Sequence, residues 1–268
     1  QKIQQTLIDA LDRVEYVRVT GRDGNETDIR VHLHNLGNPS RETNFENCVS
    51  DVNIPLGEVF TSPVLTGTSG LLHVKRVYVE GYLFKDLRLH FKDGRVTDFS
   101  CGNFISQENE TVTEENDLRQ GKDLVKQVIM RGHSWLPLGE FAIGTNTAAY
   151  AMAKKYGIGN RLPILIAEKT GPHFAVGDTC YRFAEDSPMY NPDGKEVIAR
   201  DNEISILRKE NMEKAYFSCH TDITIPYNEL GDILAVEADS SQTALIRAGR
   251  FVLPGTEELN KALDSEAL

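Results

Sequence analysis

Four short stretches of the sequence place an acidic or imidazole side chain inside an apolar run. They are IPLGEVFTSP, WLPLGEFAIGTN, LIAEKTGPHFAVG and FSCHTDITIP, which carry Glu58, Glu140, Glu168 with His173, and His220 with Asp222. Because residues i and i+2 of a strand point to one face, the last pair would hold an imidazole beside a carboxylate. On its own this spacing predicts either half of a divalent-cation site or an ordinary His–Asp hydrogen bond.

The combined charge of these residues favours the metal site. A buried carboxylate without a partner costs several kcal/mol, and the stretches contain few Lys or Arg residues to neutralise one. Glu58, Glu140 and Asp222, with one bridging hydroxide, balance the charge of two divalent cations. His173 and His220 add nitrogen ligands. A metal pair about 3.5–4 Å apart polarises a carbonyl and lowers the pKa of a shared water. These mixed donors suit zinc, cobalt or manganese without choosing among them.

Two further residues are candidates for the chemistry itself. Glu168 ends a short helix and is predicted either as a general base that binds no metal or as a carboxylate that pairs with Lys169 or solvent. Tyr181 is predicted either as a hydrogen-bond donor to a tetrahedral oxyanion or as a partly buried core tyrosine. Ala175 and Gly177 share a strand face with His173, and their small size leaves room for a substrate.

The surrounding patterns predict an α+β protein with mostly antiparallel or mixed β-sheet and a few packed helices. Helical patterns cover 1–12, about 118–132, 144–157, about 161–169 and the end of the chain from about 256. Strand patterns cover 14–21, 27–33, three or four hairpin-joined strands from 71, then 173–177, 215–226, 232–238 and 243–249. Residues 106–118 form an acidic loop, and His73 and His90 are predicted to face solvent. We expect one domain over residues 1–268.

Composition excludes several classes of function. The chain has 268 residues, a net charge of -11 and a pI near 5.2, which argues against a nucleic-acid partner or an anionic membrane surface. No apolar run has the length of a membrane span, and the N-terminus does not resemble a signal peptide. The four cysteines include no CxxC pair, which disfavours a zinc knuckle and is typical of a reducing compartment. We therefore expect a cytoplasmic protein.

Taken in order, the motifs resemble those of a known family. IPLGEVFTSP, LGEFAIGTN, EKTGPHFAVG with the following Tyr181, and the HTD of FSCHTDITIP resemble the thermophilic aminopeptidases, the M29 metallopeptidases. The resemblance extends over roughly 24–249, and GNETDIRVHL is similar to the family's Gly-x-x-Thr-Asp-Leu segment. It implies a thermophilic metalloprotease-like fold, with a sheet that is partly barrel-like.

The resemblance also implies a function. It implies a cytoplasmic, homodimeric exopeptidase that removes N-terminal residues from peptides with a free N-terminus, using two divalent metal ions, zinc or cobalt. The ligand roles carry over to Glu58, Glu140, His173, His220 and Asp222. Tyr181 matches the active-site tyrosine of the family, and either Glu140 or Asp222 is expected to bridge the metals.

Two departures from the family leave alternatives open. Family members carry another α/β domain ahead of this region, which we expect to be absent or truncated here. The acidic segment near 106–118 and the loop between His173 and His220 also lengthen the spacing between motifs. The alternatives are another metal-dependent hydrolase, such as an amidase, and a catalytically inactive metal-binding domain.

Overall fold

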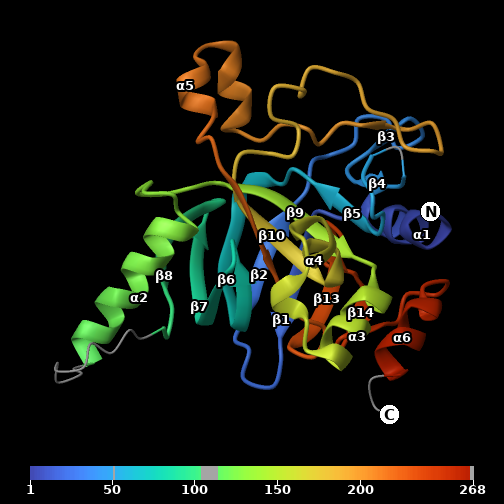
Figure 1. Ribbon diagram of the computed structural model, residues 1–268. Helices are drawn as coiled ribbons and strands as arrows, with labels where there is room; N and C mark the ends of the chain where they lie inside the picture. Colours follow the sequence, from blue (N-terminus) through green and yellow to red (C-terminus); the bar gives the residue numbers. More distant parts are fainter. Residues whose placement is uncertain (51, 104–113, 266–268) are drawn as a thin grey trace.

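Two antiparallel sheets make up most of the molecule (Figure 1). The computed structural model describes residues 1–50, 52–103 and 114–265. The larger sheet has eight strands in the order β15-β14-β13-β1-β2-β6-β7-β8. Their bounds are β1 Tyr16–Gly21, β2 Asp28–His32, β6 Val64–Val79, β7 Tyr82–Lys92, β8 Arg95–Ser100, β13 Leu230–Val236, β14 Gln242–Arg247 and β15 Arg250–Phe251. The predicted hairpins are confirmed, with turns at 80–81 and 93–94 joining β6, β7 and β8.

The smaller sheet has five strands in the order β12-β10-β9-β5-β4. Their bounds are β4 Glu46–Cys48, β5 Glu58–Thr61, β9 Leu138–Gly144, β10 Pro172–Gly177 and β12 His220–Thr224. A short parallel pair, β3 Glu42–Thr43 with β11 Glu196–Val197, lies apart from both sheets. All four motif stretches of the sequence therefore contribute a strand to this smaller sheet.

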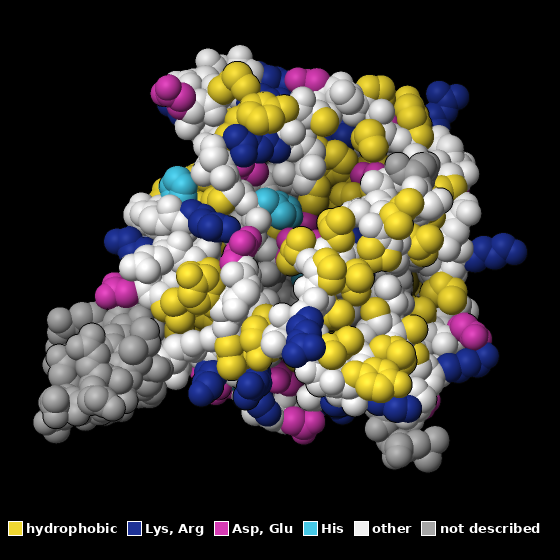
Figure 2. Space-filling model, in the orientation of Figure 1, with side chains coloured by type: hydrophobic (Ala, Val, Ile, Leu, Met, Phe, Trp, Pro, Cys, Tyr) yellow, Lys and Arg dark blue, Asp and Glu magenta, His cyan; other side chains and the backbone are white. Residues whose placement is uncertain are grey.

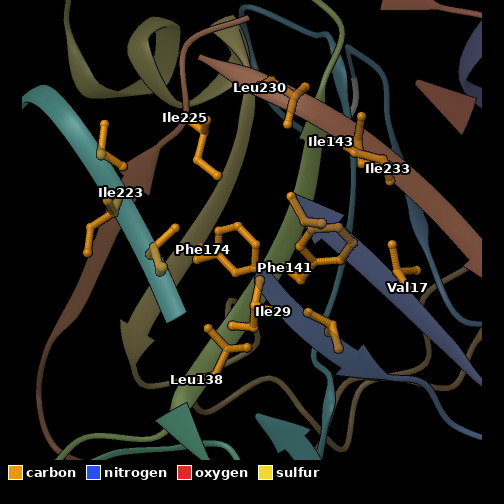
Figure 3. Packing of buried hydrophobic residues seen from close by; sticks show 14 of the residues in the cluster. Val17, Ile29, Leu138, Phe141, Ile143, Phe174, Ile223, Ile225, Leu230 and Ile233 are labelled. Carbon is orange, nitrogen blue, oxygen red and sulfur yellow. The ribbon is translucent and has the colours of Figure 1, made fainter. Parts of the chain in front are cut away.

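The sheets are open, so the expected partly barrel-like form is corrected. Closure requires hydrogen bonds between the first and last strands of a sheet, and the described residues form none between β15 and β8 or between β12 and β4. The two sheets instead pack face to face around one apolar core, as in a sandwich. Figure 3 shows Phe141 and Phe174 of the smaller sheet beside Val17 and Ile29 of the larger one.

Helices cover the ends and edges of this sandwich. Their bounds are α1 Lys2–Leu11, α2 Glu114–Val128, α3 Thr147–Tyr156, α4 Ile164–Ala167, α5 Met212–Ala215 and α6 Asn260–Asp264. α1 buries Leu7, Ile8 and Leu11 against the core, while Ile3 is only half-buried. The helix expected over 144–157 is present and is capped at both ends: the Asn146 side chain accepts a hydrogen bond from the Ala149 N–H, and Gly157 ends α3 in the left-handed region.

Three sequence expectations differ from the structure. The helix expected from about 118 begins at Glu114, and residues 106–113 of the expected acidic loop lie outside the described residues. The strand expected over 215–226 is shorter, because Asn211 caps the short helix α5 and β12 begins only at His220. His90 is exposed as predicted, but His73 is buried because the turn between β1 and β2 covers it and the Glu26 N–H donates to its Nδ1.

Candidate metal centre

Strand register places the chemical residues on one face of the five-stranded sheet. Asp222 of β12 lies opposite Ala175 of β10, and Ala175 lies opposite Glu140 of β9. Directly paired residues of antiparallel strands share a face. Glu58 starts β5 opposite Gly144, four residues along β9 from Glu140, and therefore also faces this side.

The same alternation sends apolar side chains to the other face. The residues that directly follow Glu140, His173 and Asp222 point into the core between the sheets. They are Phe141, Phe174 and Ile223, and all three are fully buried. His173 and His220 lie two residues before Ala175 and Asp222 and share their face. The sandwich core thus fixes five strands whose opposite face carries the carboxylates and imidazoles.

Glu140 lies at the middle of this cluster. Its Oε1 is 3.4 Å from His173 Nε2, and its Oε2 is 3.1 Å from His220 Nε2. His173 Nε2 is also 3.6 Å from Glu58 Oε2, and His220 Nε2 is 3.4 Å from Asp222 Oδ1. The structure therefore brings all five sequence-predicted ligands together, as two imidazole–carboxylate ends that share Glu140.

The hydrogen bonding of His220 orients it as a metal ligand would be oriented. Its Nδ1 lies 2.7 Å from the backbone oxygen of Asp178, so Nδ1 carries a proton and donates it to that carbonyl. In the neutral ring Nε2 then presents a lone pair to the oxygens of Glu140 and Asp222. Lone pairs facing one another require a positive charge between them, which is either a proton or a metal ion.

Two buried carboxylate oxygens without hydrogen-bond partners also indicate a cation site. Glu58 Oε2 and Asp222 Oδ1 accept no hydrogen bond within the described ranges, and their side chains are only 5 % and 7 % exposed. Buried carboxylate oxygens are rarely left unsatisfied, because desolvation without compensation costs free energy. Oxygen and imidazole donors of this kind fit zinc, cobalt or manganese.

Lys169 pairs with Glu168, one of the two alternatives expected for that carboxylate, and it also contacts Glu58, which the sequence did not predict. It lies in a 3-10 helix, η2 (Glu168–Thr170), its side chain is fully buried, and its Nζ is 2.9 Å from Glu58 Oε1. It also donates a hydrogen bond to Glu168 Oε1. These stretches hold few cations, but one of them, Lys169, lies between the carboxylates of Glu58 and Glu168. Its position directly after Glu168 was the available signal.

Burial and neighbouring charges shift the pKa values in the metal-free cluster. Burial lowers the pKa of His173, but the carboxylates of Glu140, Glu58 and Asp222 outweigh it and raise that pKa to about 10. Burial disfavours the Glu140 carboxylate, yet its hydrogen bonds with the two imidazoles hold its pKa below the ordinary value. Positive charge beside Glu140 is therefore strongly favoured.

Glu168 behaves differently from Glu140. Burial raises its pKa, the hydrogen bond from Lys169 lowers it, and the charges of Glu58 and Asp222 raise it further, so the net shift is upward. Its side chain is 12 % exposed, so solvent reaches part of the carboxyl group's surroundings. A carboxyl group with a raised pKa is suited to accepting and returning a proton.

Tyr181 lies to one side of the cluster. Its hydroxyl donates a hydrogen bond to Glu46, and its ring stacks on Phe60 with 6.0 Å between centroids in a small apolar cluster. The oxyanion role expected for Tyr181 stays a prediction. The preceding residue, Cys180, lies closer to the ligands: atoms of Glu140, Cys180 and His220 suited to holding a metal all lie within 4.8 Å of one another. No sequence motif marked this thiol.

Both ends of β9 pass close to neighbouring backbone. A Cβ placed on Gly139 would lie 2.2 Å from the Asp178 oxygen, and one on Gly144 would lie 2.5 Å from the Gly171 and Lys169 oxygens. Larger residues at these positions would displace one loop or the other, because separations this short do not occur between real atoms. The strand that carries Glu140 is thus held between the turn that carries Cys180 and the helix that carries Lys169.

A cavity of about 480 Å³ opens beside Asp222. Its walls come from β6, β12 and the segment from α3 to η2, and they include Tyr78, Tyr150 and Ile164. Figure 2 shows histidine and acidic side chains at a hollow in the middle of this face, next to a wide group of hydrophobic side chains. The arrangement offers a polar centre with an adjoining space of small-molecule size.

The fold and this centre define a class of protein: a β-sandwich with a buried carboxylate–imidazole cluster suited to divalent cations. The family model for thermophilic metalloproteases, M29, matches residues 1–251. The chain therefore belongs to the M29 thermophilic metalloprotease family, as its motifs indicated. No curated protein sequence matches it. No helix in the described ranges is long and apolar enough to cross a membrane.

Two solved structures share the fold. Wild-type AmpT from Thermus thermophilus is 18% identical, with a TM-score of 0.56 over 92% of this chain and 53% of AmpT. A 2,5-dihydroxypyridine dioxygenase from Pseudomonas putida KT2440 is 16% identical, with a TM-score of 0.52 over 95% of this chain and 60% of the dioxygenase. The chain thus spans about half the length of AmpT.

Proposed function

We propose that this chain is the metal-binding catalytic domain, over residues 1–268, of a metal-dependent aminopeptidase. The observation that carries the proposal is the position of Glu140, whose two oxygens lie 3.4 Å and 3.1 Å from His173 and His220. A carboxylate shared in this way is what a pair of cations requires of a bridging ligand. Membership of the M29 family supports the reaction class.

The five ligands divide between two positions. Glu58 and His173 would hold one divalent ion, His220 and Asp222 would hold the second, and Glu140 would contact both. Zinc, cobalt or manganese bound there would polarise the scissile carbonyl and lower the pKa of an attacking water. The backbone oxygen of Asp178 keeps His220 in the tautomer that presents Nε2 to the centre.

Glu168 is the proposed general base. Its raised pKa allows it to take a proton from the attacking water and to return it to the leaving amine. Lys169 orients it by donating a hydrogen bond to Oε1 while its ammonium remains paired with Glu58. The cavity of about 480 Å³ beside Asp222 would receive the first residue of a peptide with a free N-terminus.

The test is hydrolysis of aminoacyl p-nitroanilides by the purified chain. Activity is expected to disappear with a chelator and to return with zinc or cobalt. Glu140→Gln removes a charge that both positions use, and we expect it to abolish turnover and lower the metal content. Glu210→Gln, at an exposed position, is the matched control and should leave both unchanged. Full activity in Glu140→Ala would sink the proposal.

The same measurements separate the alternatives. An amidase for non-peptide substrates would bind metal at Glu140 but would turn over no peptide. An inactive metal-binding domain would bind near-stoichiometric metal and cleave neither class. Family members carry a further domain, and the chain spans 53% of AmpT. AmpT, which is the longer protein, is therefore the proper comparison sample for activity. The homodimer and the cytoplasmic location stay predictions.

A second candidate function rests on the ion pair between Lys169 and Glu58. The ammonium neutralises Glu58, and two imidazoles, His173 and His220, remain with the carboxylates of Glu140 and Asp222. Two imidazoles with one of these carboxylates make the set that binds iron(II) in many oxygenases. The likeness in fold to a dioxygenase agrees with this reading. Oxygen uptake with iron(II) and a dihydroxylated aromatic ring, without peptide cleavage, would favour it over the aminopeptidase.

A further inference from the structure

The thiol of Cys180 lies among the ligands of one metal position. Its Sγ, a carboxylate oxygen of Glu140 and a ring nitrogen of His220 all lie within 4.8 Å of one another. Asp222 faces the same place, since its Oδ1 is 3.4 Å from His220 Nε2 and accepts no hydrogen bond within the described chain. A buried, unsatisfied oxygen beside this group indicates that the space between the four side chains suits a cation.

Backbone hydrogen bonds hold the turn that carries Cys180 against the strand that carries His220. The Asp178 N–H donates to the Cys219 oxygen over 2.7 Å, and the Phe217 N–H donates to Asp178 Oδ1 over 2.6 Å. His220 Nδ1 donates to the Asp178 oxygen over 2.7 Å. Three contacts of Asp178, two residues before Cys180, therefore hold the start of this turn beside the imidazole of His220.

The two ends of the centre offer different donors. At the His173 end the carboxylate of Glu58 is paired with Lys169, and the described group whose atoms could hold a metal consists of Glu58, Glu140 and His173, which offer oxygen and imidazole nitrogen. At the His220 end a sulfur joins the oxygens and the nitrogen. Thiolate is a soft ligand that favours zinc and cobalt over manganese, whereas carboxylates alone favour the harder ions.

We propose that Cys180 binds, as a thiolate, the metal ion held by Glu140, His220 and Asp222. The inference rests on the proposed metal centre and adds a fourth donor to one of its two positions. On binding, the sulfur–hydrogen bond breaks, the proton leaves to solvent and the sulfur lone pair forms the bond to the metal. The position then prefers zinc or cobalt to manganese, while the His173 position does not share that preference.

Cobalt(II) provides a direct optical test. Chelator-treated protein is titrated with cobalt, and we expect a thiolate-to-cobalt charge-transfer band in the near ultraviolet together with visible bands of the bound ion. In Cys180→Ser the near-ultraviolet band should disappear while visible bands and bound cobalt remain. Zinc affinity at this position should fall by at least about 10- to 100-fold. Changes just outside a metal's ligands already cost that much, and Cys180 is proposed as a ligand itself. Cys219→Ser is the matched control and should keep the band.

Alkylation with iodoacetamide gives an independent readout, because Cys180 is exposed. Bound zinc should slow modification of Cys180, followed by mass spectrometry of its peptide, and leave modification of Cys219 unchanged. Cobalt bound with no near-ultraviolet band, or an unprotected Cys180 in zinc-loaded protein, would overturn the inference while leaving the aminopeptidase proposal intact. No bound metal at all, or binding unaffected by Glu140→Gln, would overturn the metal centre itself.

Discussion

The two ends of the cluster around Glu140 differ in how their negative charge is neutralised. At the end formed by Glu58 and His173, the fully buried Lys169 supplies a permanent positive charge 2.9 Å from Glu58. At the end formed by His220 and Asp222, the imidazole is 30 % exposed and no Lys or Arg of the described chain forms an ion pair with Asp222. The first end is closed and internally compensated, whereas the second is open and depends on what binds there.

The end formed by His220 and Asp222 is therefore the one that we expect to respond to solution conditions. An ammonium held between Glu58 and Glu168 cannot exchange with solvent ions, so it competes permanently with any cation at that end. The open end meets solvent through His220 and Cys180, and protons, metal ions or reagents reach it directly. We therefore expect the two positions to fill with metal at different concentrations.

The largest expected effect is on the closed end. Lys169→Met leaves Glu58 buried without its partner, and breaking a buried ion pair in this way costs about 3–5 kcal/mol. Urea unfolding of the metal-free protein should show that loss, and zinc should restore more stability in the variant than in the parent. Lys122→Met is the control, because the Lys122–Asp98 pair is exposed and such pairs contribute about 0–1 kcal/mol. Equal losses in the two variants would break the contrast between the ends.

The second effect depends on pH and concerns the metal-free protein. Neighbouring carboxylates raise the pKa of His173 from 6.5 to about 10, so the folded state holds its proton more tightly than the unfolded chain does. That stability is fully present below about pH 6.5 and is lost as the pH rises through about 10. The free energy of unfolding, followed across this range, should fall less in His173→Gln. Identical pH profiles for parent and variant would contradict the assignment of this pH dependence to His173.

The smallest effect is at Tyr181, outside both ends. Because its hydroxyl donates to Glu46, Tyr181→Phe removes this hydrogen bond to a carboxylate and should cost about 1.5–3 kcal/mol of stability with little change in kcat. An oxyanion donor behaves in the opposite way, since its removal lowers kcat by about 10²–10³. Thermal unfolding and steady-state kinetics on one preparation separate the two. Tyr156→Phe, an exposed position, is the control.

The sequence was informative where periodicity and charge act locally. Alternation along 173–177 predicted β10, and the two-residue spacing of His220 and Asp222 predicted their shared face. The helix over 144–157 could be predicted because the residues that cap it, Asn146 and Gly157, meet local backbone requirements. The five candidate ligands could be chosen because a carboxylate or imidazole among apolar neighbours needs a partner.

What the sequence could not predict depends on contacts between distant segments. His73 alternates like a surface residue, and only the turn that packs over it from another hairpin makes it buried. Lys169 was expected only as a partner for Glu168, and its contact with Glu58 depends on the 3-10 helix that turns it inward. Cys180 lies in a turn, where no period relates sequence spacing to direction, so its approach to His220 is a tertiary property.

The two glycines of β9 make the ends separately adjustable. A side chain at Gly144 would press on the backbone of Lys169 and Gly171, and one at Gly139 would press on Gly177 and Asp178, ahead of Cys180. Glu140 itself is held between them by pairing on both sides of its strand. We therefore expect a change at Gly144 to act first on the Lys169 side of the cluster, and a change at Gly139 to act first on the Cys180 side. Such a scaffold can acquire a new metal preference, or a new reaction, one end at a time.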